Sequence, residues 1–420
     1  MEMQSDESSH HGYAAERVPE SAQGSGWRIF FIVAGSLCGL PVFILSARIF
    51  GGLGFSHGLL AVLLGAGISA ILGACSAYTG SSARMGLAML ADHAFGPWGS
   101  SIVKLVIAIS LVGWFGVNIG VLGATAASAL SQMSGWHVPP LAIGLPVSLA
   151  IAATTIAGAT GLERLGSVLV PVTLIVLLAS VGLSWRHLDT AMATTGTGEI
   201  GFGGAVAAIV GSYVVGIVIQ PDYGRFVRRP WQAAMGAGLS LGVAYPLVMI
   251  LSSLASLALG APELISAMIL LGFGVPALAV LLLGAWIDSS ACLYSASLSF
   301  ANQLPRLGFA AIVATITLVG ILLVVVGADT VFIPFLMTLG VALPPLATVL
   351  ILSHFLVRVP ASFLSSVMAA ICWATGTATG GVTTQKWLTL SGLPVLDSIV
   401  ITCLTLTIFN HLIVMRHTTS

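Results

Sequence analysis

Residues 274–300 read GVPALAVLLLGAWIDSSACLYSASLSF, and they indicate the fold class of the chain. The stretch is apolar or small apart from one carboxylate, Asp288, near its middle. It is long enough to cross a bilayer as a helix, which takes about 20 apolar residues. Lipid cannot solvate a charge at that depth, so Asp288 is expected to face a cavity, pair with a cation or carry a proton. The alternative is a protonated acid hydrogen-bonded between helices.

The composition of the whole chain agrees with this stretch. Hydrophobic residues make up 57% of the 420 residues and charged residues 7%, whereas soluble domains carry about 25% charged residues. Alternating barrel strands are absent, so the spans are expected to be helices. We therefore predict an all-α polytopic membrane protein with about twelve transmembrane helices, near residues 28–50, 56–78, 101–130, 138–160, 164–185, 202–221, 232–259, 274–300, 308–327, 330–356, 360–380 and 391–415.

The distribution of basic residues predicts the orientation in the membrane. Eleven of the 14 Lys and Arg residues fall in inner segments if the N-terminus is inside; only Arg48, Arg186 and Lys386 fall outside. The positive-inside rule then predicts a multi-pass protein of the cell inner (plasma) membrane with both termini cytoplasmic. Residues 1–26 are polar and lack an apolar core, so they are expected to form a disordered cytoplasmic tail.

Two predicted spans carry residues that interrupt helices. The first contains Ser36-Leu-Cys-Gly-Leu-Pro41, and the sixth is rich in glycine up to Gly216. Interrupted segments at corresponding positions of two halves are typical of transporter binding sites. They predict inverted repeats over residues 27–185 and 200–356, with two extra helices in 360–416. Glycine and proline are also common in ordinary membrane helices, so the pattern alone leaves this open.

Aromatic residues in the third and sixth spans are candidates for ligand binding. Trp114 lies between Gly113 and Gly116 at mid-depth, away from the interface where Trp usually lies. Stacking of a planar ring on an aromatic side chain is worth about 1–3 kcal/mol. Tyr213 is a candidate second face and Ser212 a hydrogen-bonding group. A packed core Trp fits the same pattern.

Asp288 is also the candidate for cation coupling. Together with backbone oxygens around Ser36 and Gly39 it would suit Na⁺, a hard cation that takes oxygen ligands. The same carboxyl would suit H⁺. The residues alone do not decide between these ions.

Several function classes are disfavoured by what the sequence lacks. It has no Walker loop and no His-Glu-x-x-His motif, and its five cysteines match no metal-ligand spacing. No basic stripe indicates a nucleic-acid partner. We therefore expect a transporter with no enzymatic activity and no cofactor, in contact with the bilayer and a small molecule. An uncoupled facilitator or channel for a small polar solute is the alternative.

Short stretches carry a resemblance to a known family. They are Val18-Pro-Glu-Ser, His93-Ala-Phe-Gly, Val112-Gly-Trp-Phe-Gly-Val, Gly211-Ser-Tyr, residues 222–226, Trp286 through Tyr294, Phe300-Ala-Asn302 and Leu343-Pro-Pro345. In this order and spacing the chain resembles the cytosine permease-like transporters of the nucleobase:cation symporter-1 family.

The resemblance implies an inverted-repeat fold of the amino-acid symporter type and secondary active import by cation symport. The implied substrate is a small planar nitrogen heterocycle, such as cytosine or a related nucleobase, pyrimidine or hydantoin-like compound. It implies that the ring lies between Trp114 and Tyr213, with Ser212 and Gly216 beside its edge. Gly39 and Asp288 complete the predicted substrate-binding residues.

Three departures from the family pattern concern the substrate and the ion. Leu111 and Gly284 stand where cytosine permeases carry amides, and Ile287-Asp288 stands where the family has two adjacent hydroxyl residues that bind sodium. Asp288 then has three interpretations: a proton acceptor, a direct Na⁺ ligand, or a partner for ring N–H groups.

Overall fold

The computed structural model describes residues 17–157, 162–301, 306–356, 363–387 and 389–419. Over these ranges the chain is helical, with β structure limited to two isolated bridges, so the all-α prediction is confirmed. The helices are α1 Trp27–Leu37, α2 Leu40–Leu53, α3 Phe55–Ala83, α4 Leu87–Ser134, α5 Pro140–Ala157, α6 Leu162–Leu183, α7 Leu188–Met192, α8 Phe202–Gly224, α9 Pro230–Leu239, α10 Tyr245–Ala258, α11 Leu264–Leu270, α12 Gly274–Ala301, α13 Phe309–Val325, α14 Phe332–Leu356, α15 Phe363–Thr384 and α16 Pro394–Thr419.

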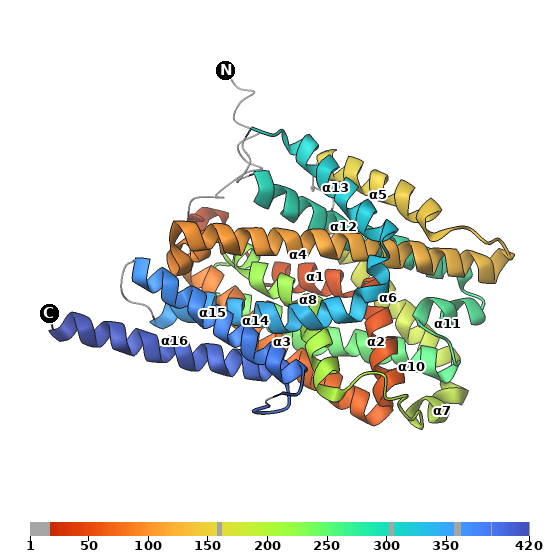
Figure 1. Cartoon of the computed structure of the whole chain (residues 1–420). Coiled ribbons are helices and arrows are strands. Elements are labelled where there is room, and N and C mark those ends of the chain that lie inside the picture. Colours follow the sequence, from red (N-terminus) through yellow and green to blue (C-terminus); the bar gives the residue numbers. More distant parts are fainter. Residues whose placement is uncertain (1–16, 158–161, 302–305, 357–362, 388, 420) are drawn as a thin grey trace, which may run out of the picture.

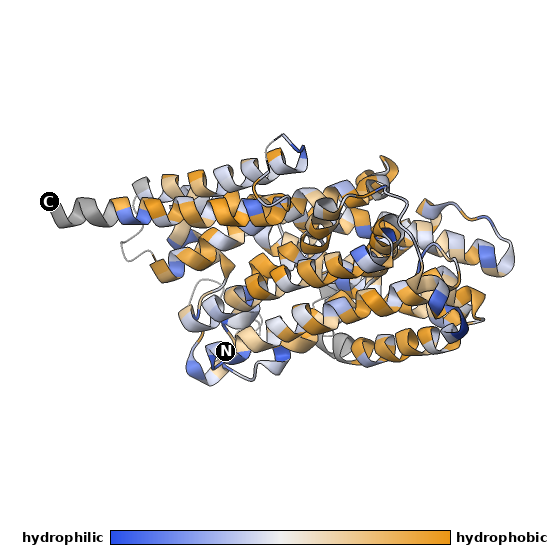
Figure 2. Cartoon of the chain, turned by 90° about the horizontal axis from the view of Figure 1, so that it is seen from below, coloured by the Kyte–Doolittle hydropathy of each residue, from blue (hydrophilic) through white to orange (hydrophobic). Residues whose placement is uncertain are grey.

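Several of these helices are long and apolar. Among the described residues, 7 helices are long and apolar enough to cross a membrane, or up to 9 if each bent pair is one span. Figure 2 shows hydrophobic residues along the length of the helices. Each predicted stretch coincides with a helix or a helix pair. The polytopic membrane fold is confirmed, whereas the count of twelve spans stays a prediction.

The helices pack in two groups that meet at the centre of the molecule. In one group α3 packs against α8 and α9, α1 against α9, and α2 against α10. In the other, α4 packs against α5, α12 and α13. Helices α15 and α16 lie together at one edge of the molecule, with α5 and α13 at the opposite edge (Figure 1), and α14 packs against α8 as well as α15 and α16. The division into two inverted repeats stays a prediction.

The predicted interruption of the first span is present. Helices α1 and α2 meet at a bend of 63°. Gly39 between them is extended, and Pro41 occupies the start of α2, where its missing N–H removes no helical hydrogen bond. A side chain on Gly284 of α12 would lie 3.1 Å from the Cys38 carbonyl oxygen. The bend therefore packs closely against the helix that carries Asp288.

The predicted interruption of the sixth span is wrong, because α8 is one continuous helix from Phe202 to Gly224. The glycines serve helix packing instead. A Cβ on Gly211 would overlap the Leu336 carbonyl of α14, and a Cβ on Gly340 of α14 would overlap the Ala207 carbonyl of α8. Small residues let membrane helices approach to backbone contact in this way.

Replacing Gly211 with alanine is expected to destabilise the protein by about 1–3 kcal/mol, because the new methyl group forces α8 and α14 apart. The thermal melting temperature of the purified protein in detergent measures this. Gly67→Ala is the matched control, since Gly67 lies within α3 and a Cβ there meets nothing within 4 Å. Equal melting temperatures for the two variants would contradict the packing role.

The predicted disordered tail is wrong for its last part. Residues 1–16 lie outside the described residues, but residues 17–26 are docked on the helices. Val18 is buried, with 1% of its surface exposed, and its amide donates to the Arg84 carbonyl at 3.2 Å. The polar composition of the segment does not predict this docking, because several of its hydrogen bonds are made by backbone groups.

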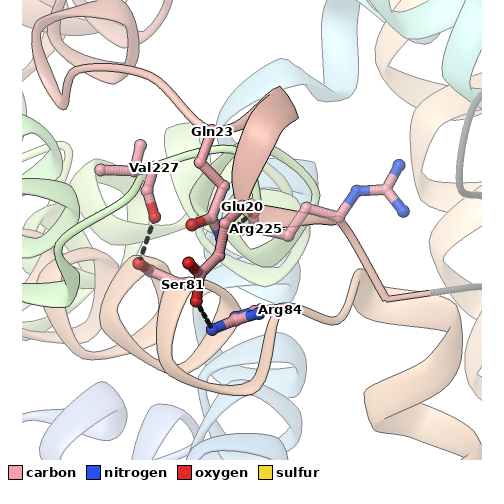
Figure 3. A network of polar contacts seen from close by, with 6 residues as sticks. All are labelled: Glu20, Gln23, Ser81, Arg84, Arg225 and Val227. Carbon is pink, nitrogen blue, oxygen red and sulfur yellow. Dashed lines mark hydrogen bonds and ion pairs between the residues drawn. The ribbon is translucent and has the colours of Figure 1, made fainter.

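Side chains strengthen the docking of this segment (Figure 3). Arg84, which follows α3, donates to the Glu20 carboxylate at 2.7 Å. Gln23 donates to the Arg225 carbonyl, just after α8, at 3.3 Å. The segment thus links α1 to the ends of α3 and α8, which belong to one packing group.

Candidate substrate and cation site

A cavity of ≈ 550 Å³ lies between α1, α4, α8 and α12. It collects side chains from both packing groups, so movement of one group against the other would change its shape. Six predicted site residues line it: Ser36, Trp114, Ser212, Tyr213, Gly216 and Asp288. The seventh, Gly39, is not among the lining residues. It lies at the bend between α1 and α2, near Gly284, and Gly284 precedes Asp288 by one turn of α12.

Asp288 is held by two donors from α4. Its Oδ2 atom accepts a hydrogen bond from Trp114 Nε1 at 2.9 Å and another from Asn118 Nδ2 at 2.6 Å. Residues four apart lie on the same helix face, so α4 presents both donors to α12 together. Asn118 is buried, with 2% exposed. Asn118 is not among the site residues predicted from the sequence, although its spacing of four residues from Trp114 was a usable signal.

The Trp114 indole is fixed on more than one side. Besides the Asp288 bond, its ring lies 6.1 Å from the Phe335 ring and 6.5 Å from the Phe332 ring, centroid to centroid, both on α14. Only 9% of the residue is exposed. Trp114 is therefore both a packed residue and part of the cavity wall, and the two interpretations of the sequence are compatible.

Tyr213 faces the same cavity from α8. Its hydroxyl accepts a hydrogen bond from Ser36 Oγ at 3.2 Å, across the gap between α8 and α1. Gly216 makes room for the ring, since a Cβ there would lie 2.7 Å from Tyr213 Cε1. Gly216 thus acts on the shape of the site through Tyr213.

Ser212 is engaged within the protein. Its hydroxyl donates to the Ile209 carbonyl at 2.8 Å and is hydrogen-bonded to the Tyr245 hydroxyl. Tyr245 is fully buried and donates to the same carbonyl at 3.0 Å. A ligand contact of Ser212 stays a prediction, and it would have to compete with these partners.

The predicted cation ligands each contact other parts of the protein, and their role in cation binding stays a prediction. Ser36 Oγ also donates to the Val33 carbonyl at 2.8 Å, Gly39 packs toward Gly284, and Asp288 bonds to α4. The described residues contain no group of three or more His, Cys, Asp or Glu side chains that could hold a metal ion.

The cavity extends to one end of the helices. Arg28, Lys104 and Arg225 line it there together with Asp222. Asp222 accepts a hydrogen bond from the Leu87 amide at 2.9 Å, and Lys104 pairs with Asp92 at 3.0 Å. The positive-inside rule predicts that this end is cytoplasmic.

The sequence matches the family model described as "permease for cytosine/purines, uracil, thiamine, allantoin" over residues 17–364. The chain belongs to this family. It is therefore a transporter of the nucleobase:cation symporter-1 type and not an enzyme, as predicted.

Individual relatives agree with this assignment. The cytosine permease of Escherichia coli K12 is 27% identical over 309 residues, which cover 70% of each chain. The inward-facing structure of Mhp1 matches with a TM-score of 0.78 at 19% identity, covering 95% of this chain and 93% of that one. Mhp1 is a transporter of the nucleobase-cation-symport-1 family. Its closed structure with bromovinylhydantoin bound matches with a TM-score of 0.75 at 17% identity, covering 94% of each chain. These structures show a shared fold.

Proposed function

We propose that this permease imports a small planar nitrogen heterocycle by cation symport with alternating access. The observation that carries the proposal is one cavity in which two aromatic rings, Trp114 and Tyr213, meet a part-buried carboxyl, Asp288. Aromatic faces favour a flat ring, and a polar group among apolar walls fixes its orientation. The cavity volume of ≈ 550 Å³ falls within the usual range for small-molecule sites.

Within the family, cytosine or a related nucleobase, pyrimidine or hydantoin-like ring is the proposed substrate class. Relatives named for cytosine and a relative seen with bromovinylhydantoin support this range. Leu111 and Gly284 cannot hydrogen-bond a ring through their side chains. Asp288 is the polar side chain of this cavity that accepts a hydrogen bond from Trp114, so we assign the polar recognition to it.

The access direction follows from the end of the helices that the cavity reaches. The cavity extends to Arg28 and Arg225, at the end proposed to face the cytoplasm of a cell inner membrane with both termini inside. Backbone contact at Gly211 and Gly340 holds α8 against α14. We assign this arrangement to an inward-facing state, because the cavity reaches the end proposed to face the cytoplasm.

H⁺ is the proposed coupling ion, ahead of Na⁺. A hard cation takes several oxygen ligands, but Gly284 and Ile287 bring no side-chain oxygen, and one oxygen of Asp288 already faces two N–H donors. A proton needs only one oxygen. Na⁺-coupled symport is the alternative, and uptake under separately imposed H⁺ and Na⁺ gradients distinguishes the two ions.

Thermal stabilisation by a panel of compounds tests the substrate class. The purified full chain is heated with cytosine, uracil, allantoin, thiamine or hydantoin, and with ribose as a polar control that lacks an aromatic ring. We expect at least one planar ring to raise the melting temperature, since a ligand that binds only the folded state stabilises it. A folded protein that none of these rings stabilises would contradict the proposal.

A further inference from the structure

The two oxygens of Asp288 have different surroundings. Oδ2 receives both hydrogen bonds from α4, at 2.9 Å from Trp114 and 2.6 Å from Asn118. Oδ1 receives no hydrogen bond from the residues that the structure describes, and Asp288 lines the cavity. The carboxyl group therefore has one oxygen committed to the protein and one open to the cavity.

This asymmetry determines where a proton can bind. An N–H group only donates, so a hydrogen on Oδ2 would point at one of two donors. The carbonyl oxygen of a neutral carboxylic acid, by contrast, can accept both N–H bonds. The proton therefore binds Oδ1, and the committed oxygen keeps its two bonds in both protonation states.

Protonation reverses the hydrogen-bonding character of Oδ1. Ionised, Oδ1 is an acceptor that would bind a ring N–H; protonated, it is a donor that would bind a ring carbonyl oxygen or a pyridine-type nitrogen. Nucleobase-like rings carry such acceptors at their edges. The two states of Asp288 thus prefer different ring edges.

We propose that Trp114 and Asn118 are positioning residues that keep Oδ2 as an acceptor, and that Oδ1 of protonated Asp288 donates to an acceptor atom of the substrate ring. This inference rests on the proposed function and specifies how ring and ion bind together. The proton comes from water in the cavity, forms the O–H bond of Oδ1, and returns to water when the ring leaves.

The consequence is thermodynamic linkage between proton and ring. Because only the protonated form makes the bond, each ligand raises the affinity for the other by the same factor. Ring binding tightens as the pH falls and takes up about one proton per ring. Trp114 belongs to both the proton site and the ring site, so it joins them physically.

Other titratable groups share the cavity with Asp288 or lie on helices packed against α12. Those that line the cavity are Arg28, Lys104, Tyr213, Asp222, Tyr223, Arg225, Cys292 and Tyr294. Among helices packed on α12, α5 and α13 carry no titratable side chain, and neither do residues 168–183 of α6. Cys38 lies at the bend between α1 and α2, and Arg48 lies further along α2. The Asp288 variants below test which of these groups sets the pH dependence.

Asp288→Asn gives the sharpest test, because an amide copies the protonated acid. Its oxygen accepts from Trp114 and Asn118, and its NH₂ donates into the cavity. Affinities for cytosine and uracil are measured between about pH 5.5 and 8. We expect the wild-type affinity for at least one ring to fall by about tenfold or more over this range, and the variant to hold its low-pH affinity throughout. Loss of binding by Asp288→Asn at every pH would overturn the proposal, since a Na⁺ ligand or an acceptor for ring N–H needs the carboxylate.

Asn118 is tested by the same pH profile. Asn118→Leu removes one donor and is expected to shift the profile, while Asn118→Gln, which keeps an amide donor, restores it at least in part. Ser110→Ala is the matched control on α4, because Ser110 bonds only to the Val106 carbonyl of its own helix. An Asn118→Leu profile that overlays that of Ser110→Ala would overturn the positioning role.

A measurement without any ring separates this proposal from the proposed function. Indole ¹⁵N spectra of the full chain in detergent are recorded across the same pH range, with Trp114 assigned from Trp114→Phe. We expect the Trp114 resonance to move with pH in the wild type and to stay fixed in Asp288→Asn. If no ring binds, the proposed function fails, but this titration still tests whether the proton binds Asp288. A Trp114 resonance with the same pH dependence in the wild type and in Asp288→Asn would overturn the proposed proton site.

Discussion

Trp114→Ala is expected to weaken binding of the substrate ring by more than about tenfold, which is 1.4 kcal/mol. The substitution removes an aromatic face, worth about 1–3 kcal/mol of stacking. It also removes the Nε1 donor from Asp288. Both losses act on the same cavity, so Trp114 has the largest expected effect on affinity.

Equilibrium binding of cytosine and uracil to purified variants measures this effect. Trp114→Phe keeps a ring but lacks the donor, so it separates stacking from the Asp288 bond. Trp98→Ala is the control on the same helix, since 89% of Trp98 is exposed. A wild-type affinity of Trp114→Ala for both rings would show that Trp114 does not contact the substrate.

Asp288→Ala is expected to abolish concentrative uptake. The substitution removes the proposed proton-binding oxygen and leaves the donors of Trp114 and Asn118 without their acceptor. A buried donor left without a partner costs about 1–3 kcal/mol. Transport then has neither a coupling group nor an intact site.

Uptake of radiolabelled cytosine or uracil into proteoliposomes measures this loss. Asp92→Ala is the control carboxylate, because Asp92 is half-exposed and its pair with Lys104 is of the surface kind that contributes little. Accumulation by Asp288→Ala at the wild-type level under a cation gradient would show that coupling lies elsewhere.

Local sequence signals predicted the features that depend on a single segment. The apolar run around Asp288 predicts a helix in lipid because its own residues determine its solvation. The Gly39-Pro41 interruption predicts a bend because proline restricts the local backbone. The structure accordingly has a continuous α12 and a bend between α1 and α2.

Features that depend on distant partners were not predictable in this way. Gly211 is as compatible with a helix break as with close packing, and the deciding residue, Gly340, lies on another helix. Asn118 is one amide in an apolar span until α12 brings Asp288 to it. The docking of residues 17–26 likewise depends on carbonyl groups near Arg84 and Arg225 that composition does not reveal.

The most direct test of cation-coupled heterocycle transport is uptake into proteoliposomes under one imposed gradient at a time. Radiolabelled cytosine or uracil is supplied with an inward H⁺ gradient, an inward Na⁺ gradient or neither. We expect accumulation above equilibrium with the H⁺ gradient, and none with Na⁺ alone or without a gradient. Accumulation driven by Na⁺ but unaffected by the pH gradient would contradict proton coupling, and equilibration at the same rate in all three conditions would identify an uncoupled facilitator.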